Sequence, residues 1–223
     1  IPTVIKADGL ALGKGVIIAM TRQEAIDAVH SMMEDKIFGE SGSNVVVEEF
    51  LTGPEVSVLA FTDGKVVKPM VSSMDHKRIG DNDTGLNTGG MGVIAPNPFY
   101  TEEVEKIAYE TILIPTIEAM NAEGRTFKGV LYYGLMITEK GPKVIEYNCR
   151  FGDPEAQVCL SLLKTDLLEI VDAVIDERLS EIEVVNEDGA AIIVMMCSGG
   201  YPEAYEKGKE IIGLDEKGQN DAF

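Results

Sequence analysis

Three polar residues alternate at the end of an apolar strand, and their types suit a metal–phosphate complex. Val144-Ile145 leads into Glu146, Asn148 and Arg150. Because side chains at i and i+2 of a strand point to the same face, Glu146 and Asn148 should project together. Carboxylate and amide oxygens suit Mg²⁺ shared with phosphates, and Arg150 could stabilise charge on a transferring phosphoryl group. The alternative is an edge strand whose polar face lies in water.

A glycine-rich loop with a lysine before it and another inside it is a second candidate. Lys6 precedes "ADGLALGKGV", residues 7–16. Backbone N–H groups of such a loop can approach phosphate oxygens while lysines neutralise them. The spacing matches neither a Walker A loop nor a Rossmann fingerprint. A surface turn with two solvated lysines is an equally good interpretation of the pattern.

The stretch "EEFLTGPE", residues 48–55, follows an apolar strand. Its end could give a purine ring an apolar slot with backbone donors and acceptors, and give a ribose a carboxylate. An exposed hairpin with three solvated acids is the alternative, and is favoured when this stretch is taken alone.

The segment "DHKRIGDNDTGLNTGGMG", residues 75–92, lies in a long polar stretch over 72–98. A loop of this length inside a domain is usually functional or disordered. Its glycines, hydroxyls and basic residues favour binding of a phosphate or a small polar substrate over a flexible linker.

The elements that would position these residues are a mixture of strands, hairpins and helices. This mixture predicts an α+β fold rather than strict βαβ alternation. Thr21 and Glu24 have the spacing of a capping box that opens a helix, and Pro115 predicts a kink or restart in a helix over 101–122. Further helices are expected over 153–163 and from 165 or 166 to 177. Strands are expected over 4–6, 16–19, 44–50, 55–62, 66–71, 129–138, 143–148 and 190–197.

The bulk composition excludes several classes of function. The chain of 223 residues is 45% hydrophobic, with a net charge of −19. Such an acidic balance argues against sequence-independent nucleic-acid binding and disfavours an anionic membrane surface. Three Cys without a CxxC pair indicate neither a disulfide framework nor a zinc site, and the longest apolar run, 190–197, is too short to span a bilayer. The opening "IPTVIKADG" has no Met, so we expect a fragment of a longer cytosolic protein.

The order of the four candidates along the chain resembles the ATP-grasp family, whose two α+β subdomains hold ATP between them. The stretches "KADGLALGKGV", "EEFLTGPEVSV", "DHKRIGDNDTGLNTGGMG" and "EYNCRFGDPE" resemble the phosphoribosylamine–glycine ligases within that family, over essentially the whole chain. The resemblance implies a small ATP-grasp subdomain over 1–66, a large one over 67–186, and the start of an incomplete C-terminal domain over 187–223. An N-terminal domain would be missing.

The resemblance also implies roles for individual residues. Glu146 and Asn148 would hold Mg²⁺ or Mn²⁺, and Arg150 would be catalytic, facing the transferring phosphoryl group. ATP would contact Lys6, Gly13, Lys14 and Gly15 with its phosphates, Glu48, Glu49, Phe50 and Leu51 with its adenine, Glu55 with its ribose, and Arg78 and Asn87 on the phosphate side of the cleft. The substrate would contact Asp83, Thr84, Thr88, Gly89, Gly90, Met91 and Gly92.

The implied reaction joins glycine to 5-phosphoribosylamine at the expense of ATP, through a glycyl phosphate, in purine biosynthesis. The expected protein is cytoplasmic and monomeric, and its expected partners are these small molecules. The fragment alone is expected to bind Mg-ATP weakly and not to turn over. A different ATP-grasp ligase and a regulatory nucleotide-binding module are the alternatives.

Two further expectations concern the strand over 143–148 and its neighbours. Many ATP-grasp enzymes place a third acidic ligand on the neighbouring strand, where this chain has Gly134. Cys149 should point away from Glu146 and Asn148, into the core. Asp153 and Glu155 have no assigned role beyond capping the next helix.

Overall fold

A computed structural model describes residues 1–11 and 15–213 of the chain. The chain forms two compact units, Ile1–Gly53 and Pro54–Phe223. This division lies before the boundary predicted after residue 66, because strand β4 (Glu55–Thr62) pairs with β10 (Gly129–Thr138) of the larger unit. That the two parts act as the small and large ATP-grasp subdomains stays a prediction.

The first unit is a small antiparallel sheet with one helix against it. The sheet has the order β2-β1-β3, from Val16–Ala19, Thr3–Ala7 and Val45–Glu49. Helix α1 (Arg22–Met33) buries Ala28 and Met32 against Ile5 of β1, and a short 3₁₀ turn follows at Gly39–Gly42. The predicted capping box is confirmed, since the Thr21 hydroxyl accepts from the Glu24 N–H and the Glu24 carboxylate accepts from the Thr21 N–H.

The second unit is built on the sheet β11-β10-β4-β5, in which β5 is Val67–Pro69 and β11 is Gly141–Asn148. Alternate residues of these strands enter two separate hydrophobic clusters, as the period of a strand requires. Val56, Val58 and Ala60 lie in one cluster, whereas Leu59 and Phe61 lie in the other. The sheet therefore has apolar residues on both faces.

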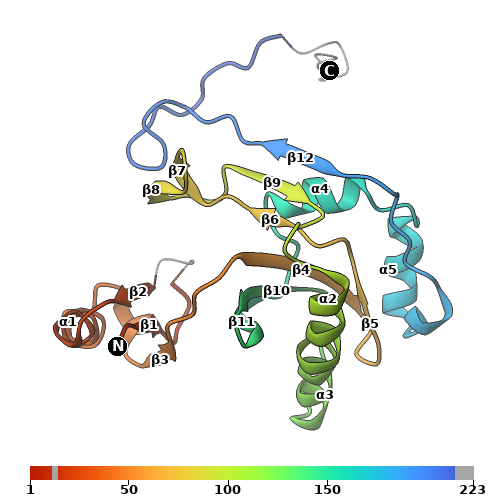
Figure 1. Ribbon diagram of the computed structural model, residues 1–223, viewed down its shortest axis with the longest axis horizontal. Coiled ribbons are helices and arrows are strands. Elements are labelled where there is room, and N and C mark those ends of the chain that lie inside the picture. The colour runs from red at the N-terminus through yellow and green to blue at the C-terminus, as the bar shows by residue number, and fades with distance from the viewer. Residues whose placement is uncertain (12–14, 214–223) are drawn as a thin grey trace. The chain divides into compact units, whose positions relative to one another are not determined.

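Helices cover both faces of this sheet (Figure 1). Helices α2 (Glu102–Ala108) and α3 (Ile114–Ala122) pack on the Val58 face. Helices α4 (Glu155–Ser161) and α5 (Leu167–Ile175) pack on the Leu59 face, and a 3₁₀ turn at Leu179–Glu181 follows them. The restart predicted at Pro115 is present as a π-helical turn, Tyr109–Leu113, because proline lacks the N–H that a continuous helix needs.

The segment over 72–98, expected to be a long loop, instead contains four short strands. These are β6 (Met74–Asp75), β7 (Arg78–Gly80), β8 (Thr84–Asn87) and β9 (Gly92–Ala95). Strands β7 and β8 form a hairpin, while β9 lies between β6 and β12 (Ala191–Val194) in a second sheet. Pairing with β12 ties part of the predicted C-terminal segment 187–223 to the larger unit.

None of the helices in the described parts of the chain has the length and apolar character needed to cross a bilayer.

Candidate functional site

The predicted metal ligands lie side by side on the edge strand β11. The Asn148 amide nitrogen is 3.3 Å from Oε1 of Glu146, so the two side chains share a face as their spacing predicts. Glu146 pairs with Gly134 across the sheet. A Cβ on Gly134 would lie 3.0 Å from Cγ of Glu146. The glycine therefore leaves room for the Glu146 side chain, and a larger residue at position 134 would crowd it.

The same sheet face continues onto β4 as a row of polar groups. Gly134 also pairs with Ser57, and Glu55 lies two residues before Ser57 on the same face. The Glu55 carboxylate forms an ion pair with Lys77, whose Nζ is 2.7 Å from Oε2. The backbone carbonyl of Glu55 accepts from the buried Asn97 amide at 2.9 Å, which fixes the start of β4. The residue expected to bind ribose thus has Lys77 as its partner.

A second pair of carboxylates lies beside this row. Glu155 is only 3% exposed and accepts a hydrogen bond from the Ser57 hydroxyl at 3.1 Å. The Tyr132 and Ser57 hydroxyls are 2.8 Å apart. Asp75 of β6 has a buried oxygen, Oδ1, that lacks a hydrogen-bond partner among the described residues. The capping role expected of Glu155 is wrong, because Glu155 is the first residue of α4 and no described side chain caps that helix. Its carboxylate belongs to this network instead.

The charges of these groups act on one another strongly. Burial, together with the charge of Glu155, raises the pKa of Asp75 to about 6, against the lowering effect of Lys77 and His76. Burial lowers the pKa of Lys77, but the carboxylates of Glu55, Glu146 and Asp75 outweigh it, so its pKa is raised. Burial and the charges of Glu155 and Glu146 raise the pKa of the Tyr132 hydroxyl. Lys77 is therefore a charged ammonium beside several acids.

The oxygen atoms of Glu146 and Asn148 suit a hard divalent cation that takes its remaining ligands from water and phosphate. Within residues 1–11 and 15–213, no three His, Cys, Asp or Glu side chains converge as a metal cluster. Glu146 and Asn148 supply one carboxylate and one amide, and the amide oxygen faces Glu146 after a half-turn of the Asn148 side chain. Mg²⁺ is commonly held by one or two protein oxygens, with water and phosphate filling the other positions.

Two residues beside the metal strand differ from expectation. Cys149 is exposed rather than in the core, because β11 ends at Asn148 and the alternation that would bury Cys149 ends with it. The Arg150 guanidinium is exposed and donates to the carbonyl of Phe151 at 2.8 Å. Its catalytic role stays a prediction.

The predicted substrate run, Thr88 to Gly92, has many of its backbone groups in use. The N–H of Gly89 donates to the Tyr201 hydroxyl at 2.9 Å. The N–H of Gly90 donates to the Thr88 hydroxyl at 3.0 Å, and that of Met91 to the His76 carbonyl at 2.8 Å. Gly92 pairs with Val194 in the second sheet. These N–H groups position the run and are not all available to an anion.

The predicted residues of the β7–β8 hairpin lie at an exposed position. Arg78 pairs with Asn87 across the hairpin, and the Arg78 guanidinium donates to the Gly85 carbonyl at 2.7 Å. Asp83 has a positive φ of 56° at the turn, and the Thr84 hydroxyl donates to the carbonyl of Asp81. The hairpin presents these side chains to solvent.

The first unit holds the other predicted nucleotide residues. Lys6 of β1 forms an ion pair with Glu48 of β3, with Nζ 2.7 Å from Oε2. Gly15 closes the base of the glycine-rich loop, because its carbonyl accepts from Ala7 at 2.8 Å. Gly13 and Lys14 lie outside the described residues. Glu49 ends β3 and is exposed, and half-buried Phe50 and Leu51 follow it.

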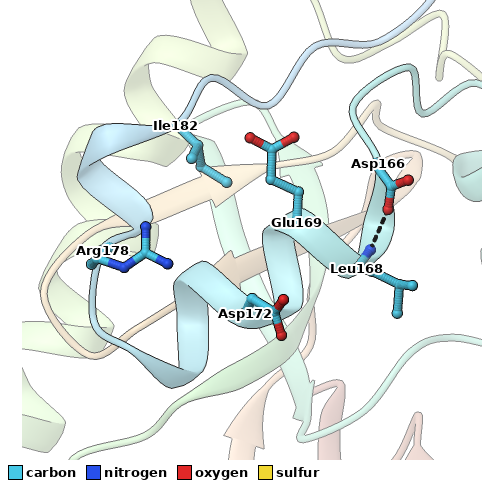
Figure 2. A pocket seen from close by; sticks show the side chains of 6 residues that line it. All are labelled: Asp166, Leu168, Glu169, Asp172, Arg178 and Ile182. Carbon is cyan, nitrogen blue, oxygen red and sulfur yellow. Dashed lines mark hydrogen bonds between the residues drawn. The ribbon is translucent and has the colours of Figure 1, made fainter.

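A pocket of about 430 Å³ lies elsewhere, at α5 and the segment after it (Figure 2). Asp166 caps α5 there by accepting from the Leu168 N–H at 2.7 Å, and Arg178 pairs with Asp176. None of the predicted site residues that the structure describes lines this pocket.

Comparison with known proteins decides the family. Residues 1–156 match the family model described as the ATP-grasp (A) domain of phosphoribosylglycinamide synthetase. The chain belongs to this family. Its α+β fold is therefore the ATP-grasp fold, as predicted.

Relatives and a solved structure extend the similarity beyond residue 156. The chain is 50% identical over 216 residues to the phosphoribosylamine–glycine ligase of Vibrio vulnificus, and 53% identical over 214 residues to the trifunctional purine biosynthetic protein adenosine-3 of Gallus gallus. A crystal structure of phosphoribosylamine–glycine ligase from Thermotoga maritima superposes with a TM-score of 0.76 at 38% identity, over 96% of this chain and 54% of that one.

The matches cover nearly all of this ATP-grasp chain but only part of its relatives. They include 96% of the chain, 50% of the Vibrio protein and 21% of the Gallus protein. The chain thus spans about half the length of the bacterial relative it matches.

The sequence did not predict the network of Asp75, Lys77 and Glu155 beside β11. Asp75 and Lys77 both stand in the segment singled out for binding, but β6 ends at Asp75, so strand alternation does not place Lys77 beside it. The contact between Ser57 and Glu155 joins residues 98 positions apart. No local pattern reports a pairing across that distance.

Proposed function

We propose that the protein containing this chain is an ATP-dependent ligase that joins glycine to 5-phosphoribosylamine, giving glycinamide ribonucleotide, ADP and phosphate. The similarity to phosphoribosylamine–glycine ligases over 96% of the chain carries this proposal. The convergence of Glu146 and Asn148 on one sheet face supports it. We infer a cytoplasmic enzyme that acts on small molecules, with Mg²⁺ or Mn²⁺, and expect a monomer.

The chemistry requires an activated carboxyl group, because a carboxylate is a poor electrophile. An oxygen of the glycine carboxylate attacks the γ-phosphorus of ATP, the bond to the β-phosphate oxygen breaks, and ADP leaves. The amine of 5-phosphoribosylamine then attacks the acyl carbon of the glycyl phosphate. The C–O bond breaks, phosphate leaves, and the amine gives up a proton.

The chain's own residues would act by holding groups in place and balancing charge. Glu146 and Asn148 would hold the divalent cation, which when bound neutralises phosphate oxygens. Lys6 lies on β1 at the base of the glycine-rich loop, where an ammonium would meet nucleotide phosphates. Glu55 would accept the ribose hydroxyls. None of these steps needs a covalent nucleophile from the chain.

The deciding experiment measures ADP release by the full-length protein with glycine and 5-phosphoribosylamine present, and with each omitted in turn. We expect release to depend on both substrates. Release that requires another carboxylate or amine would assign a different ATP-grasp ligase, and nucleotide binding without release would indicate a regulatory module. The 223-residue chain alone is expected to be inactive, and full turnover by it would refute that expectation.

Substitution of the metal carboxylate tests the assigned site within the same assay. Glu146→Gln should lower the ligase rate roughly a hundredfold or more, equivalent to ~3 kcal/mol in the barrier, because a charged metal ligand is lost. The exposed position of Glu146 predicts little change in the free energy of unfolding. An unchanged rate would show that the metal is bound elsewhere.

A further inference from the structure

Lys77 occupies an unusual place for a lysine of a substrate-binding segment. Its backbone is fixed, because its carbonyl accepts from both the N–H and the hydroxyl of Thr88, at 2.7 and 2.9 Å. Its ammonium is fixed as well, at 2.7 Å from the Glu55 carboxylate. A lysine held at both ends has a defined position, and that position is the polar face of the central sheet.

The acids around Lys77 come from three different elements. Glu55 stands at the start of β4, Asp75 on β6 and Glu146 on β11. Register places Ser57, Gly134 and Glu146 in one row, and Glu55 lies next to that row on β4. The charges of all three acids favour the ammonium form of Lys77. One cation thus balances a face that carries the proposed ribose and metal carboxylates.

We propose that Lys77 is the resident counter-ion of this face and that it competes with a divalent cation for it. This inference rests on the proposed function, because it takes Glu146 as a metal ligand. Two cations on the same polar face repel each other, and the repulsion is strong at a partly buried site. The lysine charge therefore weakens the binding of a free metal ion.

The competition has a consequence for how the site fills. A metal ion that arrives with nucleotide phosphates brings negative charge, so Lys77 opposes it less than it opposes a free ion. Lys77 thereby favours the metal–nucleotide complex over the metal alone.

The test measures binding of Mn²⁺ alone to the full-length protein, from the loss of the electron paramagnetic resonance signal of free Mn²⁺. Lys77→Met should tighten Mn²⁺ binding about tenfold or more, because an adjacent positive charge is removed. Glu55→Gln should weaken it several-fold, because Lys77 then lacks its partner. The double variant should return to within about twofold of the wild type, because both charges of the pair are gone.

A matched control separates this effect from net charge. Lys65→Met removes a lysine that also forms a 2.7 Å ion pair, with Glu177, away from the sheet face, and should leave Mn²⁺ binding unchanged. Equal tightening in this control would overturn the inference, as would unchanged or weaker binding in Lys77→Met. Weaker binding in all the Lys77 and Glu55 variants would indicate a structural role only and would also overturn it.

Failure of the proposed function is read from a separate measurement. Wild-type protein that releases ADP in a glycine-dependent reaction, but whose Mn²⁺ affinity does not respond to Lys77→Met, retains the function and refutes the counter-ion. Absence of that ADP release refutes the function and, with it, the role of Glu146 on which the inference depends.

Discussion

Replacing Asp75 by Asn should stabilise the protein at neutral pH. The Asp75 Oδ1 atom is buried without a hydrogen-bond partner among the described residues, and Glu155 adds a like charge nearby. These two effects raise the pKa of Asp75 from 3.8 to about 6. The ionised carboxylate therefore has a higher free energy in the folded protein than in the unfolded chain. Asn removes that penalty and keeps the shape of the side chain.

The size of the effect follows from the shift in pKa. About two pKa units correspond to ~3 kcal/mol. Asp75 is partly exposed, so solvent screening reduces this to about 1.5 kcal/mol. For a chain of this size, such a change raises the melting temperature by roughly 3–6 °C.

The dependence on pH identifies the cause. The folded protein holds the Asp75 proton more tightly than the unfolded chain, so the stability of the wild type falls as pH rises from about 4 to about 6. The advantage of Asp75→Asn should be near zero at pH 4 and complete above pH 7. Urea unfolding followed by circular dichroism at several pH values measures this difference directly.

One result would refute the reasoning about Asp75. If Asp75→Asn destabilises the protein by the same amount at every pH, the carboxylate takes part in a favourable contact and carries no burial penalty. The matched substitution Asp153→Asn, on an exposed carboxylate two residues from Glu155, is the control for the change in net charge.

Two further predictions concern Gly90 and Cys149 in the second unit, and a third concerns Thr21 in the first unit. Gly90→Ala should destabilise the protein by about 2–4 kcal/mol in urea unfolding, because φ is +117° there and a Cβ would lie 2.5 Å from Pro154 Cδ; an unchanged midpoint would show that the turn can relax. A thiol reagent followed by mass spectrometry should modify exposed Cys149 in the folded protein and spare Cys159, whose burial raises its pKa to about 11. Thr21→Ala should cost about 1 kcal/mol through loss of the capping box, and Thr21→Ser should restore most of it.

The parts of the fold that the sequence predicted are those with a strong local signal. The strands expected over 129–138 and 143–148 are present as β10 and most of β11, and the i, i+2 spacing placed Glu146 beside Asn148. The Thr21-x-x-Glu24 spacing predicted where α1 begins. In each case the pattern that fixes the structure lies within a few residues, so it can be read without knowing the tertiary contacts.

The parts that the sequence did not predict depend on distant partners. Strand β6 has only two residues and exists because it pairs with β9, which in turn pairs with β12 about a hundred positions later. Glu155 reads as an ordinary acid in the first turn of a helix, and only contact with Ser57 makes it part of the site. A window of ten residues contains neither partner.

The location of the candidate site follows from a change along one face of the central sheet, which is apolar at one end and polar at the other. Leu59 and Phe61 of β4 lie in the core beneath α5, and the same alternation puts Ser57 and Glu55 on that face toward the start of the strand. The backbone that holds the core therefore also holds the carboxylate and hydroxyl of the site. Rigid strands keep functional groups in place better than loops do. The acids at this end repel one another, so a cation is needed there, and Lys77 supplies it when no metal is bound.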